Sequence, residues 1–108
     1  MSENEIQYGL VLVTASSEAE AETIARTLVE EKLAACTTLM PVRSIYTWQG
    51  EVQDDREWQL IIKTDLARFQ ALEARVQQLH SYEVPEIIAI DLAAGSTPYL
   101  NWIGEMTR

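Results

Sequence analysis

The stretch CTTLMPVRSIYTW (residues 36–48), with QG (49–50) and EVQDDREWQLIIKT (51–64) directly after it, decides the fold of this chain. It predicts two long β-strands joined by a two-residue turn at Gln49-Gly50. The first strand would run about 43 Å at roughly 3.3 Å per residue, whereas most strands have about five or six residues. Part of the hairpin must therefore extend beyond its own core, and that part carries Ile45, Tyr46 and Trp48.

Such a projecting ribbon needs a partner. An isolated two-stranded ribbon with exposed aromatic side chains is marginally stable in water, and its open edges invite pairing. The simplest solution is that a neighbouring copy of the chain buries the ribbon. The sequence therefore predicts an obligate oligomer.

The two-residue turn also sets the register of the hairpin. It places Trp48 opposite Glu51 and Tyr46 opposite Gln53. Farther from the turn, Cys36 would face Lys63, unless a bulge at Pro41 shifts that pair by one residue. Because proline donates no ladder hydrogen bond, Pro41 marks either an edge strand or such a bulge.

Shorter elements flank the hairpin. An apolar strand over residues 8–14 precedes a helix that begins with a capping box at Ser17 and Glu20 and runs to about Lys32. The remaining predictions are a helix over 66–80, a strand over 86–92 after Pro85, and a terminal helix capped by Thr97, with Pro98 first and Met106 near its end.

This order of elements is βαββαβ with a short C-terminal helix, which predicts an α+β, ferredoxin-like sandwich. One antiparallel sheet would carry both main helices on one face. Residues 1–108 form a single domain, of which the polar residues 1–6 are expected to be frayed.

The composition excludes several classes of protein. The chain has 108 residues, 47% of them hydrophobic, and a formal net charge of −9. This charge disfavours nucleic acid and anionic membrane surfaces as partners. No apolar run approaches the roughly 20 residues of a membrane span, and the N-terminus lacks the regions of a signal peptide. A lone cysteine suits a reducing compartment, so we expect a cytoplasmic protein.

Catalytic and phosphate-binding motifs are missing from the sequence. Its four glycines are scattered, so neither a P-loop nor a dinucleotide-binding loop is present. Ser16 and Ser17 follow the first strand, but no base lies near them in sequence, and helix capping explains them. We therefore expect a protein that is not an enzyme.

Three residues suggest binding chemistry, each with a simpler alternative. His80 is either a metal ligand, repeated by symmetry in an oligomer, or an exposed histidine at a helix C-terminus. Cys36 is either a soft ligand for Cu(I) or a small buried hydrophobe. Lys63 either binds an anion in a cleft or is a solvated residue at a strand end.

Large aromatic residues are numerous for so small a chain. They act either as packing and interface anchors or as walls of a pocket between subunits; they are Tyr46, Trp48, Trp58, Tyr82 and Trp102. The acidic cluster of Asp54, Asp55 and Glu57 is interpreted as a charged guard on the ribbon.

Two motifs carry a family resemblance. S-I-Y-x-W-x-G (residues 44–50) and H-x-Y-E-V-P-E-I (80–87), together with LAAC, LIIKT and PYLNWI, resemble the CutA family of divalent-cation tolerance proteins. The resemblance covers residues 8–106 and implies a tight homotrimer similar in architecture to the PII signalling proteins. Thr38 and Ser81 depart from the residues common in the family.

The resemblance implies two alternative functions. The first is non-enzymatic binding of copper or another divalent cation in metal tolerance, with His80, Glu83 and Cys36 as ligands. The second is sensing or carrying a small anionic metabolite, as PII proteins do, at clefts between subunits. That cleft would be built from Lys63, Trp48, Tyr46, Tyr82 and Glu86.

Overall fold

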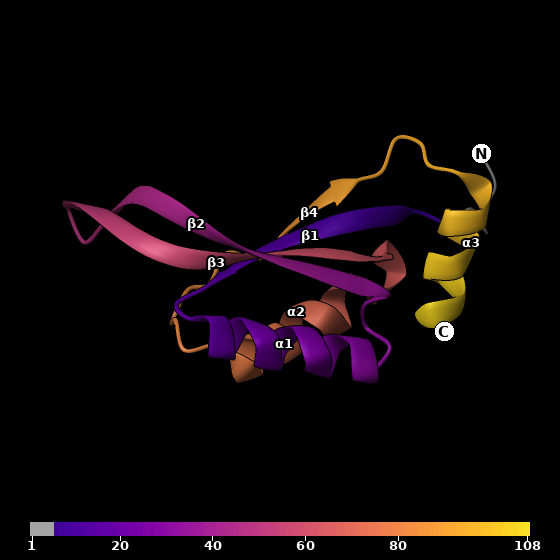
Figure 1. Ribbon diagram of the computed structural model, residues 1–108, viewed down its shortest axis with the longest axis horizontal. Helices are drawn as coiled ribbons and strands as arrows, with labels where there is room; N and C mark the ends of the chain where they lie inside the picture. Colours follow the sequence, from indigo (N-terminus) through magenta and orange to yellow (C-terminus); the bar gives the residue numbers. More distant parts are fainter. Residues whose placement is uncertain (1–5) are drawn as a thin grey trace.

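The computed structural model describes residues 6–108 and contains a four-stranded antiparallel sheet in the order β2-β3-β1-β4 (Figure 1). This order confirms the predicted ferredoxin-like fold. Its elements are β1 (Tyr8–Ala15), α1 (Glu18–Glu30), β2 (Cys36–Trp48), β3 (Glu51–Asp65), the 3-10 turn η1 (Leu66–Arg68), α2 (Phe69–Leu79), β4 (Ile88–Asp91) and α3 (Thr97–Met106). The frayed N-terminus predicted for residues 1–6 lies outside the described residues, apart from Ile6.

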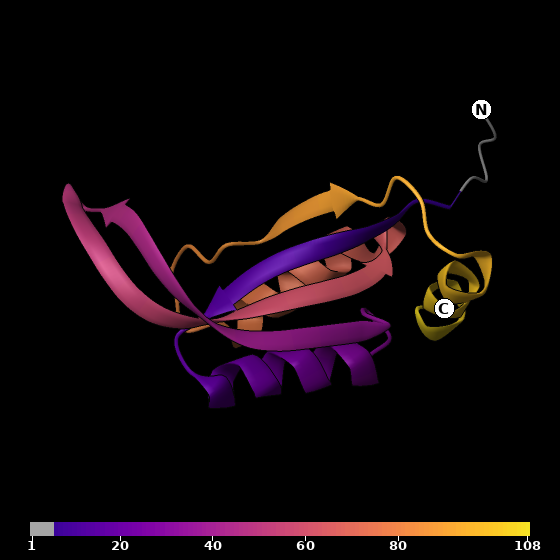
Figure 2. The ribbon, with the colours of Figure 1, turned by 45° about the horizontal axis from the view of Figure 1, so that its top comes forward.

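Helices α1 and α2 lie side by side on one face of the sheet, as Figure 2 shows. The apolar stripes of both helices meet alternate residues of the two central strands, which creates a single buried core. Its largest fully buried side chains include Ile24 and Leu28 of α1, Leu72 and Val76 of α2, Val11 and Val13 of β1, and Leu60 and Ile62 of β3.

The hairpin has the predicted register over its whole length. Trp48 pairs with Glu51, and Cys36 pairs with Lys63. Pro41 faces Trp58 without shifting the register, so it marks an edge strand and no bulge. At the turn, Gln49 and Gly50 have φ angles of 52° and 81°, the left-handed pair that a two-residue hairpin turn requires.

The outer half of the hairpin projects beyond the rest of the sheet (Figures 1 and 2). The pairing of β3 with β1 ends at Trp58 and Ala15, so within the part of the chain that the structure describes residues 42–57 pair only with each other. We call residues 42–57 the overhang. The radius of gyration is 14.7 Å, against roughly 13 Å for a compact chain of this length. The predicted projection is therefore confirmed.

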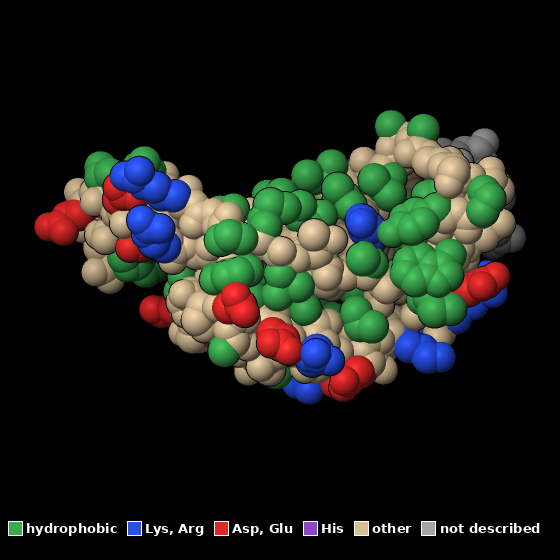
Figure 3. Space-filling model, viewed as in Figure 1, with side chains coloured by type: hydrophobic (Ala, Val, Ile, Leu, Met, Phe, Trp, Pro, Cys, Tyr) green, Lys and Arg blue, Asp and Glu red, His purple; other side chains and the backbone are tan. Residues whose placement is uncertain are grey.

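The sheet face opposite α1 and α2 carries apolar side chains that neither of these two helices covers. Because Val11 and Val13 point into the core, Leu10 and Leu12 point to this open face. The register places Ile90 beside Leu10 and Ile88 beside Leu12, and these two isoleucines are 47% and 51% exposed. Figure 3 shows hydrophobic side chains over the middle of the molecule and over α3.

Three predicted boundaries were wrong by a few residues. Helix α1 ends at Glu30, because Lys32 takes a left-handed φ of 61° and Leu33 N–H donates back to the Leu28 carbonyl. The segment predicted as one helix from residue 66 begins with η1 before α2. Ser96 occupies the N-cap position of α3 without a capping hydrogen bond from its side chain, and Thr97 is already helical.

Strand β4 is also shorter than the predicted 86–92. It pairs with β1 only from Gly9 to Leu12. Farther along β1, side chains reach the carbonyls: the Gln59 amide donates to Val13 O, and His80 Nε2 lies 2.6 Å from Thr14 O. The residues before β4 therefore run beside the sheet as a loop.

Candidate functional site

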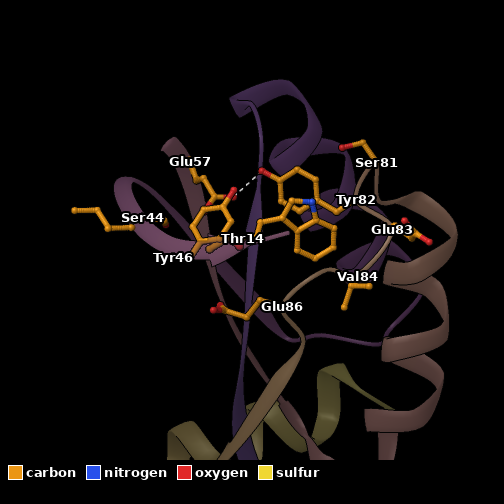
Figure 4. A pocket seen from close by; sticks show the side chains of 11 residues that line it. Thr14, Ser44, Tyr46, Glu57, Ser81, Tyr82, Glu83, Val84 and Glu86 are labelled. Carbon is orange, nitrogen blue, oxygen red and sulfur yellow. Dashed lines mark hydrogen bonds between the residues drawn. The ribbon is translucent and has the colours of Figure 1, made fainter. Parts of the chain in front are cut away.

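A cavity of 740 Å³ opens at the base of the overhang (Figure 4). This volume lies within the range of about 300–1,000 Å³ that is usual for small-molecule sites. Four parts of the chain build it: the end of β1, the overhang segments of β2 and β3, and the loop between α2 and β4. Its lining residues are Thr14, Ser44, Ile45, Tyr46, Trp48, Glu57, Ser81, Tyr82, Glu83, Val84 and Glu86.

The register of the hairpin explains why these side chains meet. Successive residues of a strand point to opposite faces, so Ser44, Tyr46 and Trp48 share one face of β2. Val42 pairs with Glu57, which places the Glu57 side chain on the same face. This face of the overhang continues the open face of the sheet.

Glu57 is the most deeply buried charged group of the cavity wall. Its residue is only 6% exposed, and Glu57 Oε2 accepts a hydrogen bond of 2.6 Å from the Tyr82 hydroxyl. Figure 4 shows this bond as a dashed line between the two side chains. Burial, and then the hydrogen bond to Glu57, raise the pKa of Tyr82 well above its usual range. Tyr82 therefore remains a neutral donor at physiological pH.

Tyr46 is held in a similar way on the hairpin. Its hydroxyl donates to Asp55 Oδ2 at 2.5 Å, and this hydrogen bond raises the pKa of Tyr46 to about 12. The ring is therefore fixed at the cavity with its hydroxyl already satisfied, so its surface is available for packing against a ligand.

The charges that line the cavity have one sign. Its ionisable residues, within the part of the chain that the structure describes, are the two tyrosines and Glu57, Glu83 and Glu86. The hairpin arginines point the other way: Arg43 pairs with Arg56 in the register, on the opposite face from Glu57. Arg43 also forms a bidentate ion pair with Asp54, which lowers the pKa of that carboxyl group. The cavity therefore has a negative lining.

The structure brings together most of the residues predicted for a ligand cleft. Tyr46, Trp48, Tyr82 and Glu86 all line the cavity, whereas Lys63 does not. Lys63 lies at the far end of the hairpin from the turn. Its Nζ atom is 4.0 Å from Cys36 Sγ and lies over the ring of Tyr99. About twelve residue pairs, or roughly 40 Å, separate Lys63 from the turn. A single chain therefore does not bring Lys63 to the other four residues, and the predicted cleft between subunits stays a prediction.

The imidazole of His80 is fully engaged within its own chain. Its Nδ1 accepts from the Tyr82 N–H at 3.0 Å, and its Nε2 lies 2.6 Å from the Thr14 carbonyl oxygen. Since a carbonyl only accepts, Nε2 carries the proton and Nδ1 is the bare nitrogen. A metal ion would have to displace one of these hydrogen bonds.

Of the other two predicted metal ligands, Cys36 lies far from His80. Cys36 begins β2 at the opposite end of the sheet, beside Lys63. Figure 4 shows the Glu83 carboxylate turned away from the Glu57–Tyr82 pair. Between residues 6 and 108, no group of at least three His, Cys, Asp or Glu side chains is placed to hold a metal ion. The predicted set of His80, Glu83 and Cys36 therefore does not form a metal site within one chain.

Glu57, the central carboxylate of the cavity, was not predicted as a site residue from the sequence. Its interpretation as a charged guard is wrong, because Glu57 is buried, while Asp54 and Asp55 have local partners in Arg43 and Tyr46. The predicted register contained the signal, since it places Glu57 on the same face as Tyr46 and Trp48. The contact with Tyr82 depends on how the loop folds back, and pairing rules do not predict that.

The fold and the cavity define a ferredoxin-like protein with a ligand-sized, acidic pocket at the base of a projecting hairpin. The family model described as CutA1 divalent ion tolerance protein matches residues 9–106. The chain therefore belongs to the CutA1 family.

Relatives and solved structures agree with this assignment. The divalent-cation tolerance protein CutA of Thermus thermophilus is 50% identical over 99 residues, which cover 91% of this chain and 96% of that protein. The mouse protein CutA is 43% identical over 97 residues, and the match covers 89% of this chain but only 55% of the mouse protein. The structure of the periplasmic divalent cation tolerance protein CutA from Archaeoglobus fulgidus has a TM-score of 0.92 and 37% identity, covering 94% and 99% of the two chains.

None of the helices within residues 6–108 combines the length and the apolar character needed to cross a bilayer.

Proposed function

We propose that this protein is a non-enzymatic, homotrimeric binding protein of the cytoplasm that takes part in the response to divalent cations such as copper. The observation that carries this proposal is the family match over residues 9–106. The relative from Thermus thermophilus is itself named a divalent-cation tolerance protein. The free thiol of Cys36 suits a reducing compartment, which supports the cytoplasmic location.

The trimer is supported by the apolar surface that a single chain leaves in water. The overhang exposes Ile45 and Val52 by 65% and 75%, and the open face exposes Ile88 and Ile90. Exposed apolar surface of this kind is typical of subunit interfaces. A cyclic arrangement of three copies would cover each overhang and each open face in the same way.

Copper binding would require more than one copy of the chain. One chain offers the single imidazole of His80, already hydrogen bonded twice, and no cluster of three ligands among residues 6–108. First-row metal ions are usually held by three or four protein ligands. We therefore propose that any tight copper site is shared between subunits.

Calorimetric titration with Cu²⁺ tests the shared site. Ile88→Arg places a charge on the open face and should dissociate the trimer, whereas Val29→Arg places the same charge on the exposed side of α1. We expect Ile88→Arg to weaken copper binding at least about tenfold, since ligands from other copies are lost. Val29→Arg should bind copper like the unmodified protein. A dissociated variant with unchanged copper affinity would contradict the shared site.

The alternative function as a small-molecule sensor is supported by the cavity itself. Its volume and its three aromatic rings suit an organic ligand. The anionic metabolite expected from the sequence is disfavoured, because the lining carboxylates would repel it and Lys63 lies elsewhere in the chain. Native mass spectrometry of the protein isolated from cells would reveal a retained ligand by its mass.

A further inference from the structure

We propose that the cavity at the base of the overhang binds a small organic ammonium ion, with the positive charge beside Glu57 and the organic part against Tyr46, Trp48 and Tyr82. This inference depends on neither metal binding nor the proposed metal response. It rests on the buried carboxylate, the aromatic walls and the single sign of charge described above.

The carboxylate of Glu57 is buried without a positively charged partner among residues 6–108. A buried charge is costly unless it is paired and hydrogen bonded. Glu57 receives one hydrogen bond, from the neutral Tyr82 hydroxyl, and no lysine or arginine of residues 6–108 forms an ion pair with it. Because Glu57 lines the cavity, a cation entering there would supply the missing countercharge.

The walls of the cavity include three aromatic rings. Aromatic rings attract organic cations through the negative charge density of their faces, and desolvation strengthens this attraction. Tyr46 and Tyr82 come from different parts of the chain, and both are fixed by hydrogen bonds from their hydroxyl groups to carboxylates. Trp48 adds a third ring to the lining. Such a set of rings favours a ligand with an alkyl or aryl group attached to the ammonium.

The cavity suits an organic cation better than a bare metal ion. A divalent metal ion needs several oxygen or nitrogen ligands at bonding distance, and the described residues provide no cluster of three. A cavity of 740 Å³ is also far larger than a single ion requires. An organic ammonium ion fills more of this volume and needs only one carboxylate beside its charge.

Three probes of the same shape and different charge test this proposal: phenethylammonium, 2-phenylethanol and phenylacetate. Calorimetric titration of the full chain, in its natural oligomeric state, should show that the cation binds at least about tenfold more tightly than the neutral alcohol. Phenylacetate should bind least. Equal binding of phenylacetate and phenethylammonium would overturn the proposal, and so would an absence of binding for all three, as expected if a neighbouring copy fills the cavity.

Two variants locate the charge that selects the cation. Glu57→Gln keeps the shape of the side chain and should weaken phenethylammonium binding about tenfold while leaving 2-phenylethanol unchanged. Glu51→Gln removes the same charge near the hairpin tip, outside the cavity lining, and should change neither affinity. Equal losses in the two variants would mean that only net charge matters and would refute a site at Glu57. If Glu57→Gln fails to fold, the three-probe comparison on the unmodified protein still decides the question.

Discussion

At the scale of single residues, a few side chains tie the hairpin and the loops to the sheet. Glu20 receives hydrogen bonds from the backbone N–H groups of Ser16 and Ser81, so it joins the start of α1 to the loop after α2. His80 bridges the Thr14 carbonyl and the Tyr82 N–H in the same region. These contacts fix the loop that carries Tyr82, and the geometry of the cavity therefore depends on residues that do not line it.

The first prediction concerns Glu20. Burial raises the pKa of its carboxyl group, but hydrogen bonds from Ser81 and Ser16 outweigh burial and leave the pKa below its ordinary value of 4.5. A carboxylate with a lowered pKa in the folded state stabilises the protein above its unfolded pKa, and this contribution is lost as the pH falls through the folded pKa. Because solvent screens this partly exposed carboxylate, Glu20→Gln should lower the free energy of unfolding by about 1 kcal/mol at most at neutral pH.

The pH dependence distinguishes this role from a general packing role. The difference between Glu20→Gln and the unmodified protein should shrink as the pH falls below 4.5. Denaturant unfolding at several pH values measures it. Glu22→Gln, which removes an exposed partner of Arg26 on the same helix, is the control and should change stability by less than about 0.5 kcal/mol. A constant difference at every pH would contradict the proposed role of the Glu20 charge.

At the scale of elements, the hairpin shows that sequence rules can predict the register of two paired strands. A two-residue turn fixes the register, and the observed pairs from Trp48–Glu51 to Cys36–Lys63 follow it without a break. Elements whose ends depend on side-chain contacts were predicted less well. Strand β4 begins beyond the point where the side chains of His80 and Gln59 contact the carbonyl oxygens of β1. No local sequence pattern predicts such contacts.

The second prediction tests the hairpin turn. Gly50 has a φ of 81°, so Gly50→Ala should destabilise the protein by about 1 kcal/mol, because an L side chain is strained in the left-handed region. Gln49 has a φ of 52° without being glycine. Gln49→Asn should therefore raise stability, since asparagine tolerates this conformation better.

Thermal unfolding at one fixed protein concentration compares the two turn variants, because the melting temperature of an oligomer depends on concentration. We expect the melting temperature to fall for Gly50→Ala and to rise for Gln49→Asn, so each variant is the control for the other. Equal melting temperatures for both variants would show that the turn conformation does not limit stability.

The same reasoning explains which parts of the candidate site were predictable. Tyr46, Tyr82 and Glu86 stood out by residue type and motif, and the structure places all three at the cavity. Glu57 resembled a solvated surface charge, since nothing in a linear charge pattern distinguishes a buried carboxylate from an exposed one. Lys63 lies at the other end of the strand in its own chain, so the predicted cleft between subunits that includes it stays a prediction.

At the scale of the whole molecule, the exposed open face and the overhang leave the isolated chain incomplete. The molecule measures 46 Å along its longest axis and only 27 and 23 Å across. Acidic side chains follow α1 along the lower edge in Figure 3, whereas hydrophobic side chains dominate the sheet and α3. This division gives the chain one surface suited to water and another suited to contact with companion copies.

The third prediction concerns this contact surface. Sedimentation velocity at micromolar concentration should show three copies for the unmodified protein. Ile88→Arg should shift the population to single copies, because a buried unpaired charge costs about 3–5 kcal/mol at an interface. Val29→Arg, with a similar starting exposure on α1, should sediment like the unmodified protein. A folded single copy of the unmodified protein would refute the trimer and with it the shared copper site.

The position of β2 at the border of the sheet has a consequence for how the protein reaches its native state. Along Cys36–Trp48 the outer backbone groups of this strand have no partner strand within residues 6–108 of their own chain. A newly synthesised copy therefore has a long unpaired strand edge until it associates with other copies. Refolding from denaturant should therefore be higher than first order in protein concentration, so that dilution slows it. Chains that have not yet associated should be the ones that precipitate.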